Sequence, residues 1–156
     1  MHIRLIAVGD RQPSWVDEAF DAYAARLPRE WKFRLEKVAT VRRAKNIDVS
    51  AAVEAEGRQV LALTKDAEQI VVLDERGAGL SSVGLSERLS AWQSAGRDLS
   101  FVIGGPDGVS RELTARADFR WSLSKLTLPH GLARVLFAEQ LYRAWSVLTG
   151  HPYHRQ

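Results

Sequence analysis

The chain has 156 residues, of which 46% are hydrophobic and 26% are charged, and it contains no cysteine. The lack of cysteine excludes disulfide bonds, thiolate catalysis and zinc sites with cysteine ligands. A chain of this length buries about 70% of its unfolded surface, so we predict a single domain over residues 1–156. The formal net charge of +3 is compatible with binding to nucleic acid but does not require it.

The first half of the chain alternates between predicted strands and helices. An apolar run over residues 3–8 predicts a strand, and it is too short for a signal peptide or a membrane span, so we expect a cytoplasmic protein. Apolar residues at helical spacing predict a helix over residues 15–27. Alternating apolar and charged residues predict a half-buried strand over 31–38, and Asp48 is a suitable N-cap for a helix over 48–63.

The second half continues the same alternation. Unbroken apolar runs over residues 69–74 and 99–105 predict strands buried on both faces, as in the middle of a parallel sheet. In chain order, we also predict a helix around residues 85–92, a helix over 110–117, a strand over 119–124 and a helix over 132–148. This pattern predicts an α/β fold with a mainly parallel sheet flanked by helices, in which ligands bind at the carboxyl ends of the strands.

Three glycine-containing loops follow predicted strands, at residues 73–79, 103–108 and 124–131. The pair Gly104 and Gly105 would let a ligand approach the backbone closely, although a simple tight turn explains the pair equally well. Gly77, Gly79 and Gly84 do not have the spacing of a dinucleotide-binding fingerprint. We therefore predict a flexible loop for that stretch.

Histidines and serines indicate no metal site and no nucleophilic triad. His130, His151 and His154 lack the cysteine partners and carboxylate spacing that a metal site uses, so surface or capping roles are expected and no metal is predicted. No serine lies in the G-x-S-x-G pattern of a nucleophile elbow.

Charged residues lie close together at two places in the sequence. Arg42, Arg43 and Lys45 lie in a polar stretch that is either a solvated loop or a contact for nucleic acid. Glu139 and Arg143 are four residues apart in the last predicted helix, which by default indicates a surface ion pair.

Three strings in the C-terminal third carry a resemblance to a known family. They are FVIGGPDG (101–108), WSLSKLTLPHGLARVLFAEQLYRAW (121–145) and GHPYHR (150–155), and they occur in this order. In these strings, and across essentially its whole length, the chain resembles the small single-domain SPOUT methyltransferases of the ribosomal RNA large subunit methyltransferase H family. Those enzymes methylate N3 of a pseudouridine in 23S ribosomal RNA. The resemblance implies a SPOUT fold with a C-terminal trefoil knot, S-adenosylmethionine as cofactor, and a homodimer built partly on the last helix.

The resemblance also implies which residues hold the cofactor. We expect an adenosine-shaped pocket in which small and apolar side chains let backbone groups face the adenine. The expected residues are Leu73, Gly104, Gly105, Leu123, Ser124, Lys125, Leu126, Thr127 and Leu128. We further expect valine at position 104 to fill the space of the ligand and to abolish binding without harm to the fold.

Residues for RNA binding and catalysis follow from charge and from the resemblance. The expected RNA contacts are Arg4, Arg42, Arg43, Lys45, Arg134, Arg143 and Tyr153. Methyl transfer from a sulfonium mainly requires alignment, but the N3 proton must also leave. Candidates for proton removal and positioning are His154, Glu139 and Arg155, and His154 comes first because histidine exchanges protons near neutral pH.

Two alternative functions remain open at this stage. A SPOUT methyltransferase can act on another RNA, such as transfer RNA. A non-catalytic RNA-binding module would explain the basic loop and tail, although it leaves the glycine loops and the knot-like string unexplained. The absence of an appended RNA-binding domain favours a structured partner, for which we expect 23S ribosomal RNA in the assembled ribosome.

Overall fold

The computed structural model describes residues 1–9, 11–46 and 48–155. Within them, five strands form one parallel sheet in the order β2-β1-β4-β3-β5. The strands are β1 (Ile3–Val8), β2 (Arg34–Val38), β3 (Gln69–Gly79), β4 (Leu99–Ile103) and β5 (Phe119–Ser122). The predicted α/β fold with a parallel sheet is thereby confirmed, and the C-terminal trefoil knot stays a prediction of the resemblance.

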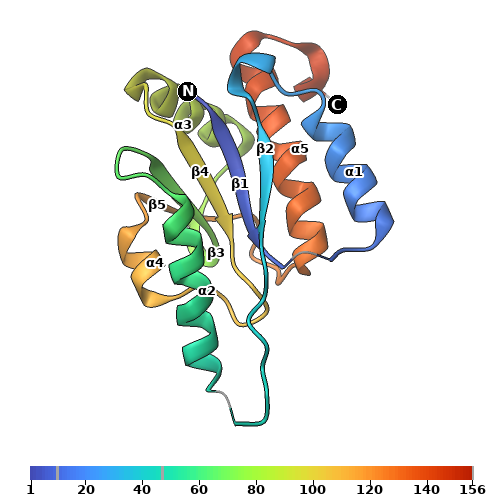
Figure 1. The fold of residues 1–156 in the computed structure, drawn as a ribbon. Helices are drawn as coiled ribbons and strands as arrows, with labels where there is room; N and C mark the ends of the chain where they lie inside the picture. Colours follow the sequence, from blue (N-terminus) through green and yellow to red (C-terminus); the bar gives the residue numbers. More distant parts are fainter. Residues whose placement is uncertain (10, 47, 156) are drawn as a thin grey trace.

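Helices cover both faces of this sheet (Figure 1). The helices are α1 (Ser14–Ala24), α2 (Val49–Leu63), α3 (Ser82–Ala95), α4 (Arg111–Arg116) and α5 (His130–Thr149), with 3-10 turns η1 (Arg29–Trp31) and η2 (Pro152–Arg155). Alternate strand residues point to opposite faces. Leu5 and Phe101 therefore pack in one core with α1, α3 and α5, while Ile6 and Val102 pack in a second core with α2 and α4.

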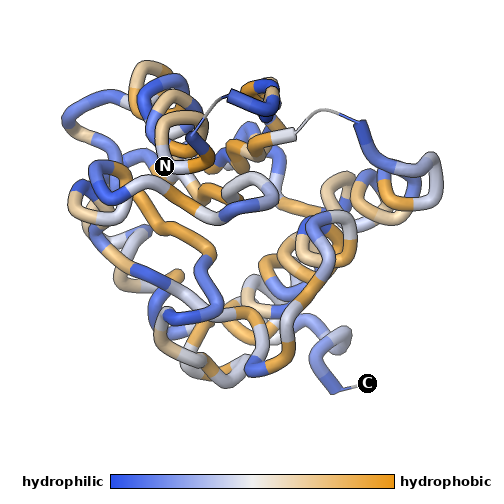
Figure 2. The backbone as a smooth tube through the Cα atoms, turned by 90° about the horizontal axis from the view of Figure 1, so that it is seen from below, coloured by the Kyte–Doolittle hydropathy of each residue, from blue (hydrophilic) through white to orange (hydrophobic). Residues whose placement is uncertain are grey.

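The strands run downward in Figure 1, so Figure 2 views the molecule from their carboxyl ends. Hydrophobic segments run through the middle of this view, as expected for strands covered on both faces. None of the helices in the described part of the chain is long and apolar enough to cross a membrane.

Two predicted elements differ from the structure. The strand predicted from residue 31 begins only at Arg34, because Lys32 adopts a left-handed conformation (φ 46°) after the turn η1. The flexible loop predicted over residues 77–84 is instead divided between the end of β3, where a register shift lets Ala78 pair with Trp121, and the start of α3. A Cβ atom at Gly77 would lie 2.7 Å from the backbone of Arg120, so glycine is needed for this close pairing.

Arg4 lies near the amino ends of the strands in a buried polar network. Its guanidinium donates to Glu68 at 2.8 and 3.0 Å, to Ser100 at 2.8 Å and to Glu36 at 3.1 Å. The residue is only 8% exposed. The expected contact between Arg4 and an RNA phosphate therefore does not fit its burial, because a buried guanidinium needs these carboxylates as partners.

Candidate functional site

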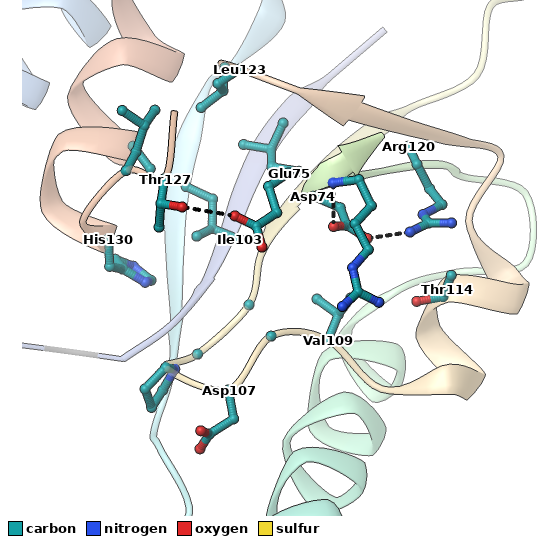
Figure 3. Close-up of a pocket in the computed structure, with 18 of the residues that line it drawn as sticks. Asp74, Glu75, Ile103, Asp107, Val109, Thr114, Arg120, Leu123, Thr127 and His130 are labelled. Atoms are coloured by element: carbon teal, nitrogen blue, oxygen red, sulfur yellow. Dashed lines mark hydrogen bonds and ion pairs between the residues drawn. The ribbon is translucent and has the colours of Figure 1, made fainter. Parts of the chain in front are cut away.

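A cavity of about 1120 Å³ opens at the carboxyl ends of β3, β4 and β5 (Figure 3). The structure brings together around it most of the residues expected to hold the cofactor: Leu73, Gly104, Gly105, Leu123, Ser124, Leu126, Thr127 and Leu128. Lys125 does not line the cavity and is exposed. The 122–126 segment is braced locally, since the Ser122 hydroxyl donates to the Ser124 carbonyl at 2.8 Å and the Leu126 N–H to the Ser124 hydroxyl at 2.9 Å.

The glycine pair after β4 packs closely against the rest of the protein, and this packing leaves no room for a side chain at Gly104. A Cβ atom at Gly104 would lie 2.7 Å from the Gly108 carbonyl oxygen, and one at Gly105 would lie 3.1 Å from Val8. The Gly108 N–H donates to the Gly105 carbonyl at 3.1 Å and closes a turn, with Gly108 at φ 86°. Valine at position 104 would therefore disrupt this turn, and the prediction that the fold would stay intact is wrong.

Charged side chains form one end of the cavity. No role was predicted for these charged residues from the sequence. Arg120 donates to the Asp74 carboxylate at 2.5 Å, and the Thr127 hydroxyl donates to Glu75 at 3.3 Å across the cavity (Figure 3). Burial alone would raise the pKa of Asp74, but the Arg76 backbone N–H and the Arg120 guanidinium outweigh burial and lower it. The string DER directly after an apolar strand was the signal available in the sequence.

His130 and Arg134 connect the cavity to the first turns of α5. The Arg134 Nε donates to the His130 Nε2 at 2.9 Å, and its Nη2 donates to the Gly9 carbonyl. Burial first, and then the positive charge of Arg134, lower the pKa of His130 to about 4. The ring is therefore neutral at pH 7. Arg134 is fully buried, and this burial does not fit its expected contact with RNA.

Gly131 explains why a glycine follows His130. A Cβ atom at this position would lie 2.8 Å from the Gln12 Oε1 and 2.9 Å from the Val16 Cγ2. Only glycine lets the start of α1 approach α5 this closely.

The low pKa of His130 predicts a pH-dependent stability. The unfolded state binds a proton below about pH 6.5 that the folded state takes up only below about pH 4, so stability is lost as the pH falls through this window. Because the ring is only partly buried, we expect the loss to be about 1–2 kcal/mol. Urea unfolding of the wild type and of His130→Gln at pH 7 and pH 4.5 checks this. An equal loss of stability in both proteins would contradict the assignment.

The C-terminal turn η2 is tied to α5 rather than frayed. Glu139, which is 9% exposed, accepts from the Arg143 guanidinium at 2.6 and 2.9 Å and from the Tyr153 hydroxyl at 2.9 Å. Burial and the neighbouring Glu139 raise the pKa of Tyr153. Glu139 and Arg143 thus form a partly buried anchor for the tail and not the surface pair that their spacing predicted. Glu139, His154 and Arg155 do not line the cavity of their own chain.

The basic loop over residues 41–46 divides into exposed and paired side chains. Arg42 and Lys45 are exposed, as RNA contacts require. Arg43 instead donates to Glu56 at 2.6 and 2.9 Å and to Asp107 at 3.1 Å. Its expected role as a phosphate contact therefore does not fit the geometry.

The fold and the cavity together indicate a class of protein. A parallel α/β sheet with a partly apolar cavity at its strand ends is typical of enzymes that bind a nucleotide or nucleoside. In the described parts of the chain, no group of three or more His, Cys, Asp or Glu side chains is placed to hold a metal ion.

Comparison with known proteins identifies the family. The family described as "Predicted SPOUT methyltransferase" matches residues 1–154, and the chain belongs to this family. It is 51% identical to ribosomal RNA large subunit methyltransferase H of Thioalkalivibrio sulfidiphilus, over 100% of both chains. It is 48% identical to the protein of the same name from Pseudomonas fluorescens, over 99% of this chain and 100% of that one.

A solved structure shows a similar fold. The probable rRNA-methyltransferase of Porphyromonas gingivalis superposes with a TM-score of 0.57 at 14% identity. The match covers 94% of this chain and 69% of that one. At this identity, the likeness supports the fold alone.

Proposed function

We propose that this protein uses S-adenosylmethionine to methylate N3 of a pseudouridine in 23S ribosomal RNA. The observation that carries the proposal is the convergence of the 123–128 segment, Leu73 and the glycine turn around one cavity. Relatives that match over the full length and are named ribosomal RNA large subunit methyltransferase H support the choice of RNA.

The residues around the cavity fit S-adenosylmethionine. Leu73, Leu126 and Leu128 provide apolar walls for the adenine, and the Glu75 carboxylate can accept from ribose hydroxyls. When bound, the cofactor supplies a methyl group on a sulfonium. The chain's own task is then to hold the target base in line with that methyl group and to exclude water.

Proton removal from N3 requires a base near the target. Glu139 is occupied by Arg143 and Tyr153, so we assign it to positioning of the tail. His154 and Arg155 are left as candidates for contact with the target base. Because they lie outside the cavity of their own chain, a second subunit can supply them in a homodimer.

We propose a homodimer that acts in the cytoplasm, and the exposed apolar residues of α1 and α5 support the dimer. Trp15 is 53% exposed and Leu132 is 40% exposed, and Leu136 lies one turn further along α5. Leu141 and Ala144, which lie further along α5, are buried in the core and are not available for such an interface. We propose that the exposed residues meet the same surface of a second copy around a twofold axis.

Methyl transfer to defined RNAs tests the proposed function. The purified protein is incubated with S-adenosylmethionine labelled in its methyl group and with ribosomes, free 23S RNA or transfer RNA. We expect label in 23S RNA from ribosomes, and no label when the target pseudouridine is replaced by uridine. Label in transfer RNA would indicate the alternative substrate. RNA binding without label would indicate a non-catalytic binding module.

A further inference from the structure

We propose that Arg43 is a positioning residue that connects the basic loop (residues 41–46) to the glycine turn (residues 105–108) of the cavity. The proposal rests on the proposed function, because it assigns the loop to the RNA side and the turn to the cofactor side. It replaces the role of direct phosphate ligand that the sequence had indicated for Arg43.

The loop side of this connection is a buried carboxylate. Glu56 lies in the middle of α2 and is only 2% exposed. It accepts from the Val41 backbone N–H at 2.9 Å and from both terminal nitrogens of Arg43, at 2.6 and 2.9 Å. Paired, two-point contact between guanidinium and carboxylate fixes orientation as well as distance. The loop is thus held at a defined position over α2.

The cavity side of the connection is the glycine turn. The remaining donor, the Arg43 Nε, donates to the Asp107 carboxylate at 3.1 Å. Asp107 belongs to the turn that Gly105 and Gly108 close, and all of these residues line the cavity. Glu56 also lies close to this turn, because a Cβ atom at Gly105 would lie 3.3 Å from its Oε1. Arg43 therefore holds the cavity wall through Asp107, while its pair with Glu56 fixes the position of its own side chain.

The geometry favours this role over phosphate binding. Nε, Nη1 and Nη2 of Arg43 all have protein partners, and the side chain is 21% exposed. A phosphate would have to displace a carboxylate from a two-point pair. The adjacent Arg42 is exposed and offers its charge to RNA without this cost.

Substitutions at two neighbouring arginines distinguish a positioning role of Arg43 from a general effect of its positive charge. Arg43→Gln and Arg42→Gln each remove one positive charge from the same loop, but only the first breaks the contact with Asp107. Affinity for S-adenosylmethionine is measured by calorimetry without RNA. We expect Arg43→Gln to weaken it about tenfold and Arg42→Gln to leave it within about twofold. Unchanged affinity in folded Arg43→Gln, or an equal loss in both variants, would overturn the proposal.

A second pair of variants covers the possibility that Arg43→Gln does not fold. Asp107→Ala leaves the buried pair with Glu56 intact, and Asp107→Asn retains an oxygen that can accept from the Arg43 Nε. We expect about a tenfold weakening of cofactor binding for alanine and less than about threefold for asparagine. Equal losses in both variants would overturn the proposal. Wild-type protein that fails to bind the cofactor at all would refute the proposed function, so the two failures are distinguishable.

Discussion

Replacement of Thr127 by tryptophan is expected to abolish binding of S-adenosylmethionine. Thr127 lines the cavity from an exposed position, and its hydroxyl points across the cavity to Glu75 (Figure 3). An indole there would occupy the space of the ligand without disturbing the core. We expect the affinity, measured by calorimetry, to fall about 100-fold or more, which corresponds to about 3 kcal/mol.

Lys125→Trp is the matched control for this substitution. Lys125 lies two residues earlier in the same segment, is also exposed and does not line the cavity. Its replacement should change the affinity by less than about threefold, as for an ordinary surface position. Wild-type affinity in a folded Thr127→Trp variant would show that the cofactor lies elsewhere. This test avoids Gly104, where any side chain would strain the turn itself.

Deletion of residues 153–156 is expected to lower methylation of ribosomes about 10²- to 10³-fold, with little change in cofactor affinity. The deletion removes His154 and Arg155, the candidates for contact with the target base. It leaves the cavity lining untouched, because none of the deleted side chains in the described part of the chain contributes to it. Rates are measured with saturating S-adenosylmethionine, and affinity is measured by calorimetry.

Tyr153→Phe distinguishes the effect of deleting the tail from the effect of losing only the hydrogen bond between Tyr153 and Glu139 that anchors it. The phenyl ring can keep the contact with Tyr142, whose ring centroid lies 4.6 Å away, but it cannot donate to Glu139. We expect this variant to keep methylation within about tenfold of wild type, since an ordinary hydrogen bond contributes about 1 kcal/mol. Near-normal methylation by the truncated protein would rule out a role of the tail in methyl transfer. Loss of cofactor affinity would mean that the tail supports the cavity.

Local patterns in the sequence were sufficient to predict the alternation of strands and helices and the three loops at the strand ends. Periodicity is a property of adjacent residues, and parallel strands bring their carboxyl ends to the same edge of a sheet. The 123–128 segment and Leu73 could therefore be expected at one site, and the structure places all of these residues except Lys125 around the cavity. The strand predicted from residue 31 was too long, because the left-handed conformation of Lys32 cannot be read from the spacing of apolar residues.

Which arginines face solvent depends on contacts between residues that are far apart in the chain. Arg4, Arg43 and Arg134 have the same side chain as Arg42, and each lies in a stretch that permits exposure. Each has at least one partner that is distant in the chain: Ser100 lies 96 residues from Arg4, Asp107 lies 64 residues from Arg43, and Gly9 lies 125 residues from Arg134. Whether a guanidinium is buried and paired depends on which distant carboxylates and carbonyls the fold brings to it. Local sequence patterns therefore predicted the edge of the sheet at which the cavity lies, whereas long-range packing determines which positive charges are available to RNA.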